Sequence, residues 1–349
     1  MFQDITVEEW LQQKHHKSMT LIDVRSPSEF REYTIPGSVN IPVFDDEERA
    51  EIGTLYKQVS VEAAKDRGLE IMSAKLPSFI RQFRELEGDK AVFCWRGGMR
   101  SRTAATVLSL MDVHVKRIQG GIKAYRKLVV DTLGSISLDT EAIVLHGFTG
   151  TGKTEVLQQL QAEGYPVLDL EGLSGHRGSI FGHIGLPSYN QKMFDAQLFE
   201  RLQELSASPY IIMEAESKRI GKVILPDFLM NKKAAGSAIV LQLPLEQRVA
   251  QIMKDYRPEE YKEQCIQAFL RIKDRIHTPI AAEIHKSLEE DRFADAVRLL
   301  LLHYYDPRYD HTSQMYGEGS KLELQADSAE DAAARLKEIL AARFQQHTS

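Results

Sequence analysis

Cysteines are scarce in this sequence, which has only Cys94 and Cys265 among its 349 residues. Two cysteines cannot provide the disulfide framework of a small secreted domain. The first residues, Met1 to Trp10, lack the basic and apolar regions of a signal peptide. Long apolar runs are also missing, because the longest aliphatic cluster, Leu299 to Leu302, falls far short of the ~20 residues that span a membrane. We therefore expect a cytoplasmic protein without a membrane partner.

An excess of positive charge is absent too. The 44 lysines and arginines are outnumbered by 50 acidic residues, and the formal net charge is −6. This balance argues against a general attraction to nucleic acid, so any nucleic-acid partner must be held by a local basic surface. The length and the hydrophobic content of 43% are enough for about two ordinary globular domains.

The chain changes character near Ser137. In roughly the first 130 residues, short apolar strands such as Met19 to Val24 alternate with amphipathic helices, which is typical of a parallel sheet covered by helices. Residues 131–141 contain Gly134 and several hydroxyl residues and show no strong periodicity, which is typical of a domain junction. We predict two α/β domains, one over residues 1–136 and one over residues 137–349.

A cysteine stands at the end of a predicted strand in the first domain. The apolar segment Lys90 to Phe93 leads into Cys94-Trp-Arg-Gly-Gly-Met-Arg100, and a helix follows. Backbone N–H groups, a helix N-terminus and two guanidinium groups would favour a reactive thiolate there. The alternative is a small buried hydrophobic residue at a strand end. We predict catalytic roles for Cys94, Arg96 and Arg100, and a donor-binding loop that includes Gly97, Gly98 and Ser101.

The first domain resembles a rhodanese module. The resemblance rests on the order of Asp23-Val-Arg-Ser-Pro-Ser-Glu-Phe, Ile35-Pro-Gly-Ser-Val-Asn-Ile-Pro, the cysteine segment and Gln119-Gly-Gly. It implies that Cys94 carries sulfur as a persulfide. However, an arginine six positions after the cysteine also matches the pattern of cysteine phosphatases. Phosphate-ester hydrolysis and chalcogen transfer from a phosphate-bearing donor both remain open, and Arg100 would hold phosphoryl oxygens in either case.

The second domain begins with a phosphate-binding motif. Glu141-Ala-Ile-Val-Leu-His is a predicted strand, Gly147-Phe-Thr-Gly-Thr-Gly-Lys-Thr matches the P-loop pattern, and a helix follows from Glu155. In such a loop, glycines let the backbone wrap phosphate oxygens, a lysine adds positive charge, and a hydroxyl binds magnesium or phosphate. We therefore predict a phosphate site at Gly147, Gly150, Gly152, Lys153 and Thr154, with Mg²⁺ as an optional ion.

Carboxylates follow two further predicted strands of this domain. Glu214 and Glu216 come after residues 210–213, and Asp169 comes after Tyr165-Pro-Val-Leu. Either group is a candidate to lie near the phosphates, and either is equally well explained as a solvent-facing acid.

The whole chain resembles the tRNA 2-selenouridine synthase family, whose members join a rhodanese module to a P-loop domain. Ala215 departs from the family, in which an acidic residue is expected at this position. Besides the cysteine segment and the P-loop, the resemblance rests on Gly53-Thr-Leu-Tyr-Lys-Gln, His176-Arg-Gly-Ser with Phe181-Gly, Glu216-Ser with Arg219-Ile-Gly, and Tyr305-Asp-Pro with Tyr309.

This resemblance implies a tRNA-modifying transferase. Sulfur in wobble 2-thiouridine would be replaced by selenium from selenophosphate, through an S-geranylated intermediate made from geranyl diphosphate. Cys94 would carry selenium or assist its delivery, Arg96 and Arg100 would neutralise the donor phosphate, and the P-loop would bind the prenyl diphosphate. No tightly bound cofactor is expected, and a selenophosphate-supplying enzyme is a candidate partner. A rhodanese-type sulfurtransferase or phosphatase fused to a P-loop kinase is the alternative.

Local basic residues would have to hold the tRNA. For each of them, a role as an ordinary solvated surface residue is an equally good explanation. No set of histidines and cysteines has the spacing of a zinc site, and Cys265 is expected to be a packing residue. The candidate tRNA contacts are His176, Arg177, Lys218 and Arg219, with Lys222, Lys232, Lys233, Arg271, Lys273 and Arg275 as further basic residues.

Overall fold

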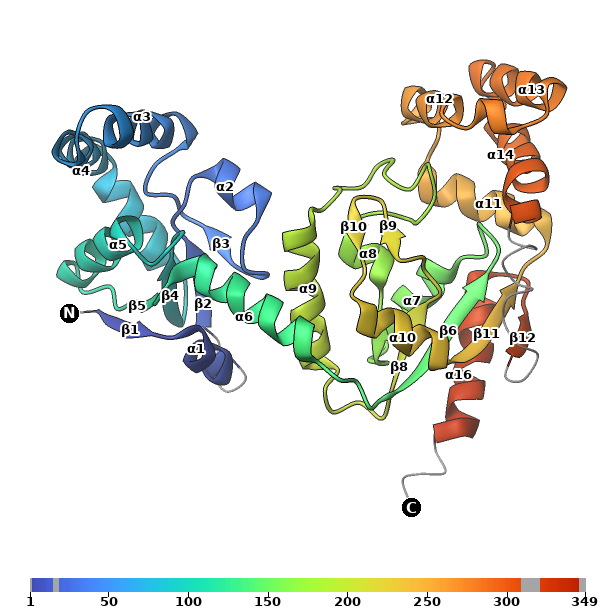
Figure 1. Ribbon diagram of the computed structural model, residues 1–349, viewed down its shortest axis with the longest axis horizontal. Coiled ribbons are helices and arrows are strands. Elements are labelled where there is room, and N and C mark those ends of the chain that lie inside the picture. The colour runs from blue at the N-terminus through green and yellow to red at the C-terminus, as the bar shows by residue number, and fades with distance from the viewer. Residues whose placement is uncertain (1, 15–18, 309–320, 345–349) are drawn as a thin grey trace. The chain divides into compact units, whose positions relative to one another are not determined.

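A computed structural model describes residues 2–14, 19–308 and 321–344 (Figure 1). The chain forms two compact units. The first comprises residues 1–135 with residues 192–200, and the second comprises residues 136–191 and 201–349. The sequence did not indicate that residues 192–200 belong with the first unit, because a helical pattern does not reveal which core a helix joins. None of the described helices is both long and apolar enough to cross a membrane.

The first unit is built on a five-stranded parallel sheet with the order β1-β5-β4-β2-β3. Its strands are β1 (Gln3–Ile5), β2 (Met19–Asp23), β3 (Val39–Asn40), β4 (Asp89–Phe93) and β5 (Lys116–Ile118). Its helices are α1 (Val7–Lys14), α2 (Pro27–Glu32), α3 (Asp46–Gln58), α4 (Val61–Glu85), α5 (Met99–Leu110) and α6 (Gly121–Ser135).

Helices from two parts of the sequence contribute to the packing of this unit. Helices α4 and α5 pack on the sheet through side chains that include Phe79, Phe83 and Leu108. Residues 192–200 of helix α9 (Gln191–Glu204) join the unit because Tyr125 of α6 donates a hydrogen bond to Glu200 Oε1 at 2.9 Å and its ring meets that of Phe199 edge to face.

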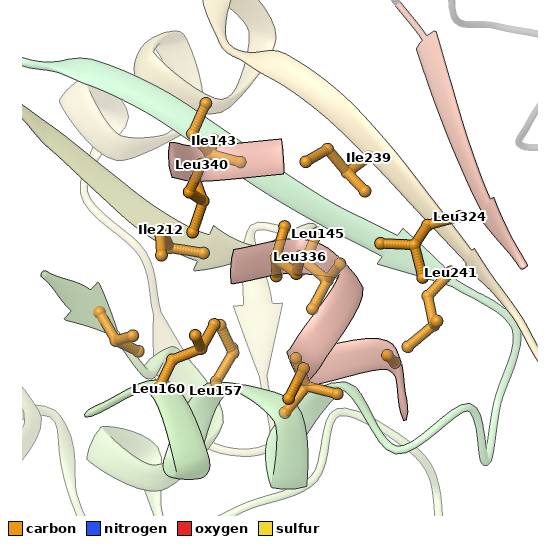
Figure 2. Close-up of a cluster of buried hydrophobic side chains, with 14 of the residues drawn as sticks. Ile143, Leu145, Leu157, Leu160, Ile212, Ile239, Leu241, Leu324, Leu336 and Leu340 are labelled. Carbon is orange, nitrogen blue, oxygen red and sulfur yellow. The ribbon is translucent and has the colours of Figure 1, made fainter. Parts of the chain in front are cut away.

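The second unit contains another five-stranded parallel sheet, with the order β12-β11-β6-β8-β7. Its strands are β6 (Glu141–Gly147), β7 (Val167–Leu168), β8 (Tyr210–Glu214), β11 (Ser237–Gln242) and β12 (Lys321–Gln325). Figure 2 shows the core between this sheet and helices α7 (Lys153–Ala162) and α16 (Ala329–Phe344), where Leu157, Leu160, Leu336 and Leu340 meet the strand side chains Ile143, Leu145, Ile212 and Leu241.

The rest of the second unit is largely helical. Helices α11 (Leu245–Tyr256), α12 (Lys262–Leu270), α13 (Thr278–Glu289) and α14 (Phe293–Leu300) gather beyond one end of its sheet (Figure 1), and a π-helical turn, η2 (Leu301–Tyr305), follows α14. The remaining elements are α8 (Leu170–Ser174), α10 (Asp227–Ala235), the short 3₁₀ helix η1 (Lys273–Arg275) and an antiparallel pair, β9 (Arg219–Ile220) with β10 (Val223–Ile224). The predicted fold class is confirmed: a parallel-sheet unit, a second α/β unit with a P-loop, and a helical C-terminal region.

Candidate functional site

Cys94 lies where β4 ends and a short loop leads to α5. We call residues 94–98 the cysteine loop; α5 begins at Met99, so Arg100 stands in the first helical turn rather than in the loop. The Cys94 side chain is buried, and its Sγ lies 3.2 Å from Oγ of the buried Ser101. The hydroxyl is therefore placed to donate a hydrogen bond to a thiolate, and the N-terminus of α5 adds positive potential beside it.

A second loop packs directly on the cysteine loop. The N–H of Ile122 donates to the Cys94 carbonyl at 2.9 Å, and that of Lys123 donates to the Trp95 carbonyl at 3.1 Å. Gly121 has a φ of +58°, and a Cβ there would lie only 2.1 Å from the Cys94 carbonyl oxygen. The two backbones are in contact, so Gly121 determines the shape of the cysteine loop as much as the residues within it.

The two predicted catalytic arginines have different environments. Arg100 is largely buried and forms an ion pair with Glu29, with Nη2 at 3.2 Å from Oε1. Burial opposes ionisation of Glu29, but its hydrogen bond to Arg100 and the charge of Arg100 lower its pKa overall. Arg96 is exposed and has no ion pair among residues 2–14, 19–308 and 321–344. Arg100 is thus held in a set position by α2, and Arg96 is open to solvent.

A large groove of about 970 Å³ borders the first turn of α5. Helices α3 and α4 form its walls, and Met99 and Arg100 line it. The segment Gly53-Thr-Leu-Tyr-Lys-Gln, which had no assigned role, contributes Gly53, Tyr56, Lys57 and Gln58 to the lining. This part of the family resemblance therefore lies next to one of the predicted catalytic residues.

The P-loop of the second unit connects β6 with α7. Gly147, Gly150 and Gly152 have φ values of 158°, 81° and 71°, of which the last two are in the left-handed region. A Cβ on Gly150 would lie 2.8 Å from Ile252 Cδ1 of α11, so the loop also abuts a helix from later in the chain. Lys153 Nζ donates to the carbonyls of Gly147 and Phe148 at 2.9 and 3.3 Å. Lys153 lines one pocket together with Gly152 and Thr154 at the N-terminus of α7, so the ammonium group and the helix N-terminus border the same space.

Thr154 contacts a carboxylate that was not among the predicted candidates. Its Oγ1 lies 2.7 Å from Oε2 of Glu171, and the backbone N–H of Glu171 donates to Oε1 of Glu214 at 2.9 Å. Glu216 lines the pocket that also contains Lys153, Thr154 and Glu171, which we call the phosphate pocket. Asp169 instead caps α8 and accepts from the N–H of Gly172 at 2.7 Å. The sequence indicated Glu214, Glu216 and Asp169 but not Glu171, because no local pattern shows which carboxylate reaches Thr154.

The carboxylates beside Thr154 resist ionisation. Burial, with repulsion from Glu216, raises the pKa of Glu171 to about 8. Burial also raises the pKa of Glu214 well above its usual range, and Asp169 and Glu171 add to the effect. At neutral pH these two side chains are largely protonated, so they can share hydrogen bonds at the phosphate pocket without adding much negative charge.

A buried arginine that the sequence did not indicate supports the P-loop. Arg248 of α11 donates from Nε to the Thr149 carbonyl at 2.9 Å, and its guanidinium group binds Asp306 at 3.0 and 2.6 Å. The same group lies 5.1 Å from the centre of the Phe148 ring. Asp306 belongs to one of the segments that carry the family resemblance, whose Tyr309 lies outside the described residues.

The four candidate tRNA contacts differ in exposure and in their partners. Arg177 lines the phosphate pocket, donates to the Ile184 carbonyl at 2.9 Å and stacks over the Tyr256 ring. His176 is half-buried against Gly182 and Gly221, and burial lowers its pKa. Lys218 and Arg219 are exposed, and Lys218 pairs with Asp227 at 2.6 Å. Among the described residues, no group of three or more metal-ligating side chains has an arrangement that would hold a metal ion.

The fold and the two sites define a chain with a rhodanese-like unit followed by a P-loop unit. The rhodanese-like domain family matches residues 6–128, and the family described as the tRNA 2-selenouridine synthase AAA domain matches residues 140–339. The second match covers more than half of the sequence. The chain belongs to the tRNA 2-selenouridine synthase family.

Relatives with the same family name agree with this assignment. A tRNA 2-selenouridine synthase of Hydrogenovibrio crunogenus is 32% identical over 85% of this chain and 90% of its own length. The proteins of the same name from Nitrosomonas europaea and Nitrosomonas eutropha are 36% and 37% identical, each over 68% of this chain. The matches span 63% and 62% of the length of these two relatives.

Proposed function

We propose that this protein is a tRNA-modifying transferase that converts wobble 2-thiouridine to 2-selenouridine in two steps. The proposal rests on one observation: a chain of this family carries both a buried cysteine, with its Sγ 3.2 Å from the Ser101 hydroxyl, and a P-loop. One site suits a chalcogen donor, and the other suits a diphosphate leaving group.

The first proposed step is geranyl transfer in the second unit. The sulfur of 2-thiouridine attacks C1 of geranyl diphosphate, the C1–O bond breaks, diphosphate leaves, and the base loses its N3 proton. Lys153 and the P-loop N–H groups would stabilise the departing diphosphate. Arg177, which lines the same pocket, would add a second cation. Thr154 and Glu171 offer oxygen atoms of the kind that Mg²⁺ prefers, so they would hold a magnesium ion once Glu171 loses its proton, and the ion would offset negative charge on the leaving group.

The second proposed step is selenium transfer in the first unit. Selenium from selenophosphate forms the new bond to C2 of the base, the C–S bond breaks, and geranyl thiol leaves. Water cleaves the P–Se bond and releases phosphate. Arg100, fixed by Glu29, and the exposed Arg96 would neutralise the donor phosphate. Cys94 would either carry the selenium or direct its delivery, and an enzyme that makes selenophosphate would be the matching partner in the cell.

Mass spectrometry of tRNA nucleosides tests this proposal. A host that lacks the protein is complemented with wild type, Cys94→Ala, Lys153→Ala or the exposed control Arg67→Ala. We expect selenouridine with wild type and Arg67→Ala, geranylated thiouridine without selenouridine with Cys94→Ala, and neither product with Lys153→Ala. Absence of both products with wild type would contradict the proposal and favour a sulfurtransferase or phosphatase joined to a kinase.

A further inference from the structure

The phosphate pocket adjoins a second, apolar cavity in the same unit. The phosphate pocket has a volume of about 300 Å³ and includes Lys153, Thr154 and Arg177 in its lining. The second cavity, of about 50 Å³, lies among α11, α12, α13, α14 and η2, the helices beyond the sheet in Figure 1. We call it the apolar cavity. Thr149, Ser179, Ile252, Tyr256 and Tyr305 line both spaces, so the two adjoin each other along these side chains.

Polar groups are confined to the mouth of the apolar cavity. Ser179 Oγ lies 3.1 Å from the Tyr256 hydroxyl, and both residues line the phosphate pocket as well. Burial raises the pKa of Tyr256 and of Tyr305, so both phenols stay neutral and act only as hydrogen-bonding groups. A ligand that enters from the P-loop therefore passes from charged to neutral polar surroundings at these two rings.

Beyond the mouth, the wall is hydrocarbon. Leu288, Phe293, Val297 and Leu300 line the inner end, and these side chains cannot pair with the polar edge of a base or a sugar. A ligand suited to both spaces has a phosphate chain at one end and a hydrocarbon chain at the other. Because the cavity is small, only the distal part of such a chain would enter it, with the proximal part in the phosphate pocket.

We infer that the apolar cavity holds the hydrocarbon chain of the prenyl diphosphate whose phosphates bind the P-loop. This inference rests on the proposed use of geranyl diphosphate. Ile252 connects the P-loop with the apolar cavity, because its side chain lies against Gly150 and also lines both spaces. The chain's reactive carbon then lies beside Tyr256 and Arg177, at the open side of the phosphate pocket.

Calorimetric titration of the full-length protein with geranyl diphosphate and with inorganic diphosphate tests this assignment. Wild type should bind geranyl diphosphate at least about tenfold more tightly, because the chain buries apolar surface. Val297→Phe, which fills the cavity, should reduce affinity for geranyl diphosphate to that for diphosphate. Ala294→Phe introduces the same ring on α14 outside the cavity lining and should retain the preference.

Unchanged binding of inorganic diphosphate shows that a variant is folded. Val297→Asn, which is polar but similar in size to valine, provides a second test, and it should also lower the affinity for geranyl diphosphate. A full preference for geranyl diphosphate in Val297→Phe would overturn the cavity assignment, and so would the absence of any preference in wild type. Nucleoside analysis distinguishes failure of the cavity assignment from failure of the proposed function. If Val297→Phe makes geranylated tRNA normally, the cavity assignment fails but the proposed function is unaffected. If wild type makes no geranylated tRNA, the proposed function itself is contradicted.

Discussion

The cysteine loop and the P-loop are both short connections from a parallel strand to a helix, yet their glycines contact different neighbours. In the first unit, Gly121 lets one backbone segment lie against another, at the Cys94 carbonyl. In the second unit, Gly150 lies against the Ile252 side chain of α11. The first loop presents a thiol, and the second presents N–H groups and an ammonium group. The same local geometry therefore supports two kinds of chemistry, according to which groups face the ligand.

The carboxylates beside the two loops also have different neighbours, and their pKa values shift in opposite directions. Glu29 pairs with Arg100, and the pair lowers the pKa of the carboxyl group. Glu171 meets the neutral hydroxyl of Thr154 and the nearby Glu216, and its pKa is raised to about 8. The paired cation keeps one acid ionised, and burial, with repulsion from Glu216, outweighs the charge of Lys153 and keeps the other protonated.

The largest effect is expected from the backbone contact at the cysteine loop. Gly121→Ala forces a Cβ to within 2.1 Å of the Cys94 carbonyl at a φ of +58°, so we expect a loss of about 2–5 kcal/mol of unfolding free energy in urea titrations. Gly98→Ala is the matched control, because nothing lies within 4 Å of the position that a Cβ would take there. Equal losses in the two variants would contradict the contact.

The support of the P-loop by Arg248 is the next test. Asp306→Asn leaves the buried Arg248 guanidinium group without its ionised partner, and we expect a loss of about 3 kcal/mol in unfolding free energy together with weaker diphosphate binding. Asp227→Asn breaks the exposed pair with Lys218 and should cost less than about 0.5 kcal/mol. A stable Asp306→Asn variant with normal diphosphate affinity would show that the pair does not hold the loop.

Opposite pH dependences should distinguish the two carboxylates. The lowered pKa of Glu29 means that its pair stabilises the fold above the unfolded pKa and that this stability is lost as the pH falls through the folded value. The raised pKa of Glu171 means that its contribution is present below the unfolded pKa and is lost as the pH rises toward about 8.

Melting temperatures measured from about pH 4 to about pH 9 would reveal the difference. Relative to wild type, Glu29→Gln should be most destabilised at neutral and higher pH, with the difference shrinking in acid. Glu171→Gln should gain on wild type as the pH rises. Parallel curves for the two variants would contradict the assigned environments.

The smallest effect concerns a surface outside both loops. Arg219→Ala should leave stability nearly unchanged, and if Arg219 contacts a tRNA phosphate, the slope of log affinity against log salt concentration should fall by about one. Arg67, an exposed residue of the first unit paired with Glu51 and Glu70, supplies the control variant Arg67→Ala. An unchanged slope for Arg219→Ala would remove this residue from the tRNA surface.

Much of both loops was predictable from contiguous residues. A strand, a glycine-containing turn and a helix start are written in neighbouring positions, so Cys94 and the segment from Gly147 to Thr154 could be located without a structure. The helical extent was less accurate, because a helix can begin inside a loop motif, as α5 does at Met99. The segment 192–200 was missed for a different reason, since its membership depends on contacts with Tyr125.

The sequence by itself determined the two α/β units and the positions of Cys94 and the P-loop at the ends of strands, because these depend on local backbone preferences and hydrophobic periodicity. Only the tertiary structure decided which groups surround them. Glu29 reaches Arg100, Glu171 reaches Thr154, and Asp306 reaches Arg248 across long stretches of chain. The apolar cavity beside the phosphate pocket also arises only when distant helices pack together, since side chains far apart in sequence must meet to enclose a space.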